Sequence, residues 1–276
     1  MKKKKMYVMF SLLLLVLTLG LFSPSPVYAA KKTASKYTIY VNRKTNLVNV
    51  VDTKSKKVVR AMYCSTGKNN RTITGTYSTK ARYRWRYLKG NVYGQYATRI
   101  HGSYLFHSVP YYKKNVTKVE TAEYNKLGEQ ASLGCVRLTV ADAKWIYDKC
   151  RIGTKVVIND KKELQKPKYL PIKISTKNKA GWDPTDPNKK NPYYPRIAVK
   201  KGQQKITKES SFDPFSAVTV TSKTFSEAEL RENLSVKGKV NTKKNGKYSL
   251  TYLVKDPRTE LVTTKKITFT VTSNNT

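Results

Sequence analysis

The sequence predicts a mainly β protein with two domains and a short helix, and three observations carry this prediction. The 276 residues suffice for about two domains of ordinary size. Strand-forming segments at 38–41 and 47–51 flank a polar turn at 42–46, which is typical of a β-hairpin. The C-terminal third contains several short alternating segments, which favour a small β-sandwich.

The chain is strongly basic, with 55 Lys and Arg against 17 Asp and Glu, a net charge of +38 and a pI near 10.1. Such a charge favours polyanionic surroundings. No zinc-finger, aromatic-platform or recognition-helix signature is present, so nucleic acid is not the expected partner. Anionic wall polymers fit better with the export signal described next.

The amino terminus has the pattern of a secretory signal peptide over residues 1–29. Four lysines at 2–5 precede an uncharged run at 6–22, and residues 23–29 supply a helix-breaking end that finishes at Ala29. The apolar run is shorter than the ~20 residues of a membrane span. We therefore expect cleavage, secretion and no stable membrane insertion, with an uncleaved anchor as the alternative.

Strand signals continue at 58–63 and lead into Cys64. The segment 82–86 alternates arginine with aromatic residues, which predicts a half-buried strand with aromatic side chains on one face and guanidinium groups on the other. The aromatic face is expected in the core.

One cysteine, Cys135, stands out because it lies between a glycine and a nearby arginine in the segment 132–138. A nucleophilic thiol needs a stabilised thiolate and a base. The only histidines, His101 and His107, both lie upstream and are the candidate bases.

The segment Phe-His-Ser-Val-Pro at 106–110, followed by Ser-Leu-Gly-Cys-Val-Arg-Leu at 132–138, resembles the L,D-transpeptidase (YkuD-type) catalytic domain. The resemblance covers about residues 37–159 and implies a β-sandwich with a short helix after the cysteine. It also implies peptidoglycan cross-linking by cysteine acyl transfer. Leu133 stands where the family has histidine and Ile73 where it more often has proline.

His107 is favoured as the base because Phe-His-Ser matches the family pattern by position. It precedes Cys135 by 28 residues, which exceeds the compact family spacing and implies an insertion at 111–131. This insertion is expected as a long loop or short helix that could cover the cleft. His101, which is followed by glycine as in compact relatives, is the alternative base and is otherwise expected to be an ordinary neutral side chain.

The resemblance implies a role for each residue of the site. Cys135 is the nucleophile, His107 the general acid and base, and Ser108 orients the histidine, through a backbone carbonyl. Because glycine lets the backbone approach closely, the N–H groups of Gly134 and Cys135 are expected to receive the oxyanion. Arg137 either binds a substrate carboxylate or forms a structural salt bridge. No metal and no cofactor are implied.

A helix is expected after this motif, beginning at a capping box formed by Thr139 and Asp142. Its buried face contains Ala143, Ile146 and Cys150. A strand at 154–158 follows the helix. Cys64 and Cys150 either form a disulfide or, as we favour, are small buried apolar residues.

Residues 160–195 carry six prolines and many lysines and are expected to form a semi-extended linker. Residues 196–273 are expected to form the second domain, in which an Asn-Gly turn at 245–246 precedes strands at about 248–254 and 267–271. The run at 246–256 resembles bacterial immunoglobulin-like domains of surface proteins. Such a domain is expected to be a spacer or a wall-binding module.

The sequence therefore predicts a secreted, wall-associated L,D-transpeptidase that acts on peptidoglycan peptide stems. By the resemblance, Cys135 attacks the third residue of a tetrapeptide stem, releases D-alanine and passes the acyl group to the amine of another stem. The alternatives are an L,D-carboxypeptidase that passes the acyl group to water and a non-catalytic wall-binding protein.

Overall fold

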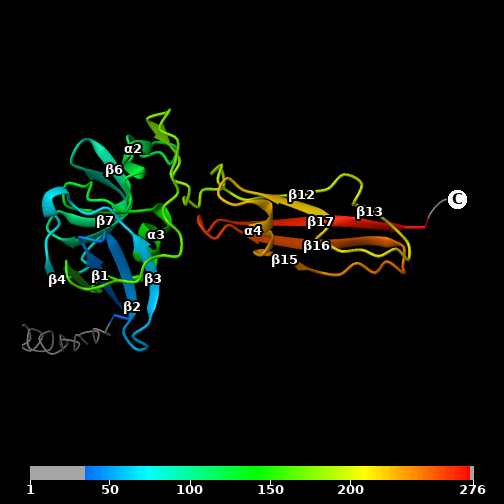
Figure 1. Cartoon of the computed structure of the whole chain (residues 1–276), viewed down its shortest axis with the longest axis horizontal. Coiled ribbons are helices and arrows are strands. Elements are labelled where there is room, and N and C mark those ends of the chain that lie inside the picture. Colours follow the sequence, from blue (N-terminus) through cyan, green and yellow to red (C-terminus); the bar gives the residue numbers. More distant parts are fainter. Residues whose placement is uncertain (1–34, 274–276) are drawn as a thin grey trace, which may run out of the picture. The chain divides into compact units, whose positions relative to one another are not determined.

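The computed structural model describes residues 35–273, so the expected signal peptide at 1–29 lies outside the described residues. Strands make up most of the regular secondary structure of these residues, as predicted (Figure 1). Within them, no helix has the length and apolar character required to cross a membrane.

The first sheet contains the predicted hairpin. Its strand order is β3-β2-β1-β10-β4, with β1 parallel to β10 and antiparallel to β2. The bounds are β1 Tyr37–Asn42, β2 Leu47–Asp52, β3 Val58–Tyr63, β4 Gly75–Ser78 and β10 Lys155–Asn159. A short 3₁₀ helix, Lys68–Asn70, lies between β3 and β4. The prediction of strands at 38–41, 47–51, 58–63 and 154–158 is confirmed.

The second sheet carries the two sequence motifs. Its order is β5-β6-β7-β9, and β7 is parallel to β9. The bounds are β5 Arg82–Leu88, β6 Val92–His101, β7 Tyr104–Ser108 and β9 Val136–Leu138. Helix α3, Val140–Lys149, packs against β6 and β7, and the core between these elements includes Phe106, Val136 and Ile146.

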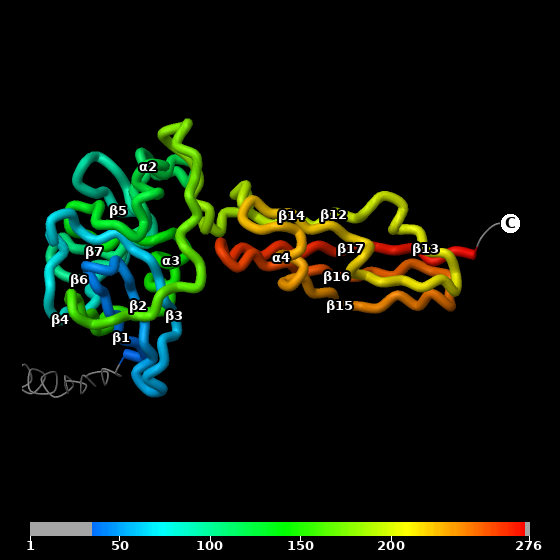
Figure 2. Tube along the Cα trace, viewed as in Figure 1, coloured from blue at the N-terminus to red at the C-terminus, as the bar shows by residue number. Residues whose placement is uncertain are grey.

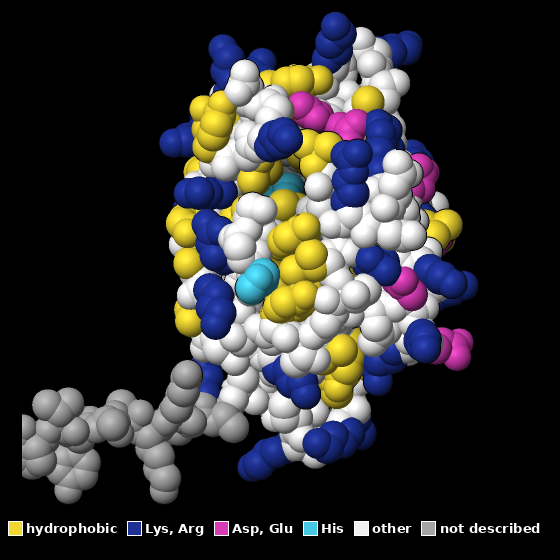
Figure 3. All heavy atoms as spheres, turned by 90° about the vertical axis from the view of Figure 1, so that its left-hand side faces the viewer, with side chains coloured by type: hydrophobic (Ala, Val, Ile, Leu, Met, Phe, Trp, Pro, Cys, Tyr) yellow, Lys and Arg dark blue, Asp and Glu magenta, His cyan; other side chains and the backbone are white. Residues whose placement is uncertain are grey.

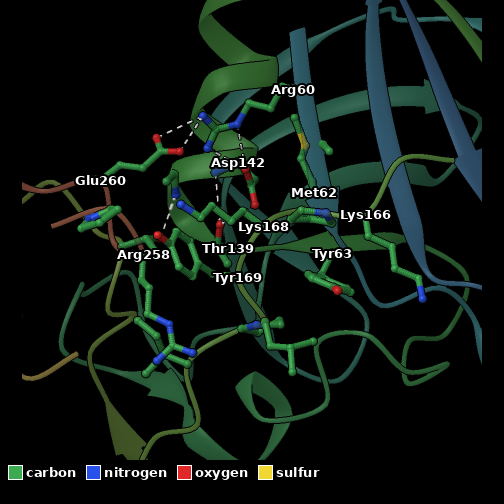
Figure 4. Close-up of a pocket in the computed structure, with 18 of the residues that line it drawn as sticks. Arg60, Met62, Tyr63, Thr139, Asp142, Lys166, Lys168, Tyr169, Arg258 and Glu260 are labelled. Atoms are coloured by element: carbon green, nitrogen blue, oxygen red, sulfur yellow. Dashed lines mark hydrogen bonds and ion pairs between the residues drawn. The ribbon is translucent and has the colours of Figure 1, made fainter. Parts of the chain in front are cut away.

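Helix α3 begins as predicted. The Thr139 hydroxyl accepts from the Asp142 N–H at 3.2 Å, and Arg60 forms an ion pair with Asp142 at 2.7 Å (Figure 4). The face predicted to be buried is buried, including Cys150. Cys64 and Cys150 are both free and fully buried, so the small-apolar interpretation is confirmed and no disulfide joins them.

The insertion at 111–131 does not form the expected cover over the cleft, because many of its residues belong to the hydrophobic core. Strand β8, Val119–Glu120, and helix α2, Thr121–Tyr124, fall within it. Tyr111 and Tyr124 are among the largest fully buried side chains, and Tyr111 exchanges backbone hydrogen bonds with Tyr93 of β6. Its aromatic residues supply the apolar area that fixes it in place.

The segment 160–195 is not the expected semi-extended linker, because it packs against the core of the first domain. Its strand β11, Ala180–Gly181, pairs with β8, and Ile174 joins the core. Asp183 accepts from the Val140 N–H and Thr185 accepts from the Ala141 N–H, both at 2.9 Å. These N–H groups lie in the first turn of α3 and lack helical partners, so the segment caps the helix. Figure 2 shows it, in lime green, running beside α2 and α3.

The second domain is a set of antiparallel and parallel strands around its own core. One sheet has the order β13-β17-β16-β15, and a second pairs β12 with β14. The predicted strands at about 248–254 and 267–271 are confirmed as parts of β16 and β17, and Leu250, Tyr252 and Val254 of β16 are buried against Phe269 and its neighbours. The bounds are β12 Arg196–Val199, β13 Lys205–Thr207, β14 Val218–Thr221, α4 Glu227–Arg231, β15 Leu234–Lys237, β16 Gly246–Lys255 and β17 Val262–Thr272.

Two truncated chains test whether 160–195 belongs to the catalytic domain. We expect a chain ending at residue 195 to unfold in a single thermal transition, because all its caps are present. A chain ending at residue 159 loses two caps of α3, each worth about 1 kcal/mol, and the core contact of Ile174. Its Tm is therefore expected to fall by many degrees, as measured by circular dichroism; equal Tm values would contradict this assignment.

Candidate active site

A cavity of about 300 Å³ opens where β7 and the segment before β9 meet the β5–β6 hairpin. Cys135 and His107 both line it, together with the cationic side chains of Arg86, Arg99 and Arg137. Figure 3 shows a face of the molecule that carries histidine, many Lys and Arg side chains and few Asp and Glu side chains.

The pairing of β7 with β9 brings the two motifs together. In this parallel register His107 lies opposite Arg137. Because side chains alternate along a strand, residues 135 and 137 point to the same side. The 28 residues between His107 and Cys135 are taken up by the packed insertion, so the chain distance does not separate them in space.

His107 is buried, with only 2% of its surface exposed. Its Nδ1 lies 2.5 Å from the backbone carbonyl of Ser108. A carbonyl oxygen only accepts, so Nδ1 carries the proton and Nε2 is left as the basic nitrogen. Burial, together with a smaller effect of the positive charge of Arg137, lowers the pKa of His107 to about 3, although the hydrogen bond to Ser108 acts in the opposite direction.

The ring of His107 packs directly on the backbone of β6 at Gly94. A Cβ at position 94 would lie 2.8 Å from the His107 Nδ1 and 3.0 Å from its Cβ. Only glycine leaves room for the imidazole in this position.

The Cys135 thiol is partly buried and its Sγ lies 3.7 Å from the Ser103 carbonyl. Burial raises the pKa of Cys135 above its ordinary value, although the Leu105 N–H and the charges of Arg137 and Arg99 act in the opposite direction. This differs from the expected stabilised thiolate. Cysteine and histidine are both neutral near pH 7, because burial disfavours both charged forms.

The loop that presents Cys135 is held by two hydroxyl groups. Ser132 Oγ accepts from the Gly134 N–H at 2.9 Å and donates to the Cys135 carbonyl at 2.6 Å. Thr72 Oγ1 donates to the Gly134 carbonyl at 2.8 Å. Gly134 has φ +137, and a Cβ there would lie 2.9 Å from the Tyr104 ring. The positive φ and this close approach explain why position 134 is occupied by glycine.

The same contacts correct one expected role. The N–H of Gly134 is occupied by Ser132, so in this arrangement it does not point a free donor at an oxyanion. The hydroxyl of Ser132 competes for that donor because it lies two residues away in a tight turn.

Arg137 lines the cavity and also forms an ion pair with Glu123 of α2. Glu123 in turn bonds to Lys126. The structural salt bridge, one of the two roles expected for Arg137, is therefore present in the structure. The guanidinium of Arg137 remains at the wall of the cavity.

His101 lies apart from this arrangement. It is exposed, its ring stacks on Tyr77 with centroids 5.1 Å apart, and it is not among the residues lining the cavity. The cavity favours His107 as the partner of Cys135. Within residues 35–273, no group of three or more His, Cys, Asp or Glu side chains is arranged to hold a metal ion.

Sequence reasoning missed Gly94, Thr72, Ser132 and Glu123 as contributors to the site. Thr72 and Ser132 lie inside segments that had been singled out, so their hydroxyl groups were a usable signal. Gly94 and Glu123 carried none, because their importance depends on which strand or helix they face.

The fold agrees with comparisons against known proteins. Residues 36–158 match the L,D-transpeptidase catalytic domain, YkuD, and residues 200–271 match the bacterial surface protein Ig-like domain. The chain thus contains an L,D-transpeptidase catalytic domain followed by a bacterial surface Ig-like domain.

A curated relative is named "Putative L,D-transpeptidase YciB" of Bacillus subtilis (strain 168). It is 44% identical over 96 residues, which cover 33% of this chain and 48% of the relative. The chain thus spans about half the length of the curated relative it matches.

Solved structures show a more distant likeness. One is a fused Zn-dependent amidase/peptidase/peptidoglycan-binding domain-containing protein from Clostridium acetobutylicum ATCC 824, with 28% identity, a TM-score of 0.35 and coverage of 45% of this chain and 51% of that one. Another is an L,D-transpeptidase from Mycobacterium tuberculosis H37Rv, with 21% identity, a TM-score of 0.36 and coverage of 45% and 57%.

The neutral resting thiol predicts the pH dependence of Cys135 alkylation. Thiolate is the reactive form, so the iodoacetamide rate, followed by intact mass, is expected to rise steadily with pH through 9. A plateau below pH 7 would indicate a thiolate–imidazolium pair instead. Cys64 and Cys150 are fully buried and are expected to react only after unfolding.

Gly94→Ala is expected to displace the His107 ring, because its Cβ would overlap Nδ1. We expect acylation of Cys135 by a carbapenem to slow by about 100-fold, in the range of a lost general base. Gly102→Ala is the matched control, since φ there is +48 but the new Cβ would meet nothing within 4 Å. Equal rates in the two variants would contradict the role of Gly94.

Proposed function

We propose that this protein is a secreted peptidoglycan L,D-transpeptidase that works through an acyl-enzyme on Cys135. The observation that carries the proposal is the placement of His107 and Cys135 in one cavity by the β7–β9 pair of an L,D-transpeptidase catalytic domain. The donor is a tetrapeptide stem, as the family resemblance implies.

In the first half-reaction, His107 Nε2 accepts the thiol proton as Sγ attacks the carbonyl of the third stem residue. This transfer suits a pair that is neutral at rest, because charge develops only as the new bond forms. The Cys135 N–H, rather than that of Gly134, receives the oxyanion. The imidazolium then protonates the departing amine of D-alanine, and a thioester remains on Cys135.

In the second half-reaction, the side-chain amine of another stem attacks the thioester carbonyl. His107 accepts a proton from that amine and returns it to the departing sulfur. Throughout, the bond from Nδ1 to the Ser108 carbonyl keeps Nε2 as the nitrogen that exchanges protons. The product is a link between the third residues of two stems.

The charges at the cavity support a substrate that carries carboxylates. Arg86, Arg99 and Arg137 line it, and Arg137 keeps its position through Glu123. Guanidinium groups bind carboxylates with two parallel hydrogen bonds. We assign substrate binding to Arg137, with its ion pair serving to hold it at the wall.

Location follows from the same proposal. The protein is secreted and wall-associated, and its partners are peptide stems and anionic wall polymers. The Ig-like domain, of a type found on bacterial surfaces, supports this location. Its net excess of lysine favours retention by anionic polymers.

Incubation with a carbapenem and with purified muropeptides tests the chemistry. We expect a covalent adduct on Cys135, cross-linked dimers from wild type, and neither from Cys135→Ala. His107→Ala is expected to slow acylation by about 100-fold or more, while His101→Ala, the control, keeps the wild-type rate.

Each other outcome points to a different function. Products trimmed by one D-alanine without dimers would indicate an L,D-carboxypeptidase. A lack of adduct in the folded wild-type protein would favour a non-catalytic wall-binding protein. Full activity of His107→Ala with loss in His101→Ala would refute the choice of base.

A further inference from the structure

We propose that Asp186 and Gln95 are positioning residues for His107, through which the segment 180–191 forms part of the catalytic apparatus. This inference rests on the proposed function of the Cys135–His107 pair. It assigns a purpose to buried polar groups that the reaction itself does not use.

The first link joins the segment to β6. Gln95 Nε2 donates to Asp186 Oδ2 at 2.9 Å, and both residues are buried, with 0% and 2% of their surfaces exposed. Asp186 is itself held on three sides, because Oδ1 accepts from the Asn188 N–H, its carbonyl accepts from Asn191 Nδ2, and its N–H donates to the Asp183 carbonyl. It is a fixed anchor for the Gln95 side chain.

The second link joins β6 to the histidine. The Gln95 N–H donates to Ser108 Oγ at 2.8 Å, and the Ser108 carbonyl binds His107 Nδ1. The neighbouring residue, Gly94, lies against the imidazole ring. The position of residues 94–95 therefore sets both the hydrogen bond and the packing of His107.

The pairing of β6 with β5 includes this stretch, at Arg86↔Gly94 and Trp85↔Gln95, but the pairing of β6 with β7 does not. The β6–β7 pairs run from His101↔Tyr104 to Thr98↔Phe106 and stop there, short of His107 and Ser108. Between the paired part and Gln95 lies Tyr96, a bulky residue with φ +48. A strained residue of this kind persists only where its surroundings hold it. The hydrogen bond from Gln95 to Asp186 fixes the residue next to Tyr96 and so helps to hold Tyr96 in this conformation.

Neither proposed residue lines the cavity, so neither touches substrate. Arg137 is the charged side chain that acts on His107. The other titratable or charged groups that line the cavity with it are the Cys135 thiol, the Tyr87 and Tyr104 hydroxyl groups, the Lys89 ammonium and the guanidinium groups of Arg86 and Arg99. Loss of the anchor is expected to let the ring move and water reach it. Because burial is the main cause of its low pKa, hydration raises that pKa toward the ordinary value of about 6.5.

The test measures the rate of carbapenem acylation of Cys135 against pH in the full-length protein. In wild type, the rate is expected to fall only as pH drops toward about 3, the pKa of His107. Gln95→Met keeps the backbone N–H and the approximate shape but removes the donor to Asp186. Asp186→Ala removes the acceptor, and Asp186→Asn retains one acceptor oxygen.

We expect Gln95→Met and Asp186→Ala to lower the rate at pH 7 by about tenfold, which is less than the loss of about 100-fold or more expected when the general base is removed. We also expect both variants to move the acid limb upward by one pH unit or more. Asp186→Asn is expected to recover part of both effects. Thr185→Val is the matched control, since it removes a cap of α3 in the same segment without touching β6. It should lower Tm and leave the acid limb in place.

The proposal is overturned if the folded Gln95→Met and Asp186→Ala variants keep the wild-type rate and acid limb. It is also overturned if Thr185→Val shifts the limb equally, or if every variant fails to fold, since the residues would then be needed for stability alone. Failure of wild type to form any adduct would instead refute the proposed function.

Discussion

The parallel pairing of β7 with β9 is the constraint on which the site depends. It places His107 opposite Arg137 and leaves Cys135, two residues earlier, on the same side of the sheet. Parallel strands require a connection that returns to the starting edge. Here that connection is the insertion at 111–131, whose buried tyrosines make it part of the core. A long insertion and a compact site are therefore consistent with one another.

Burial determines the electrostatic character of the reacting pair. It raises the pKa of Cys135 and lowers that of His107, so each group is neutral before substrate arrives. A preformed ion pair would need to keep two opposite charges in a partly buried cavity at a desolvation cost. The neutral pair avoids this cost at rest, and in the proposed mechanism charge develops only during the attack of the thiol on the substrate.

Much of the fold could be predicted because it depends on local patterns. The hairpin at 38–51, the helix N-cap at Thr139 and the strand at about 248–254 follow from local residue patterns alone. The segment 160–195 could not be assigned in this way. Its prolines and lysines are typical of a linker, whereas its role depends on Asp183 and Thr185 reaching the free N–H groups of α3. Such long-range partners leave no periodic signal.

The residues of the candidate site divide in the same way, into those that short motifs identify and those whose role depends on long-range contacts. Cys135 and His107 were identified from short motifs, while the loss of Gly134 as a free donor depends on the rotamer of Ser132. Gly94 could be recognised only once β6 was known to pass beneath the imidazole.

Arg137 links these observations, because its charge acts on both reacting groups. It lowers the pKa of Cys135, which favours the thiolate, and lowers that of His107, which weakens the base. An unpaired guanidinium would strengthen both effects. Glu123 offsets part of this field while fixing the side chain at the cavity wall. In the proposed mechanism the ion pair therefore has a second role besides holding Arg137 for a substrate carboxylate, since it moderates the charge beside a histidine that must still accept a proton.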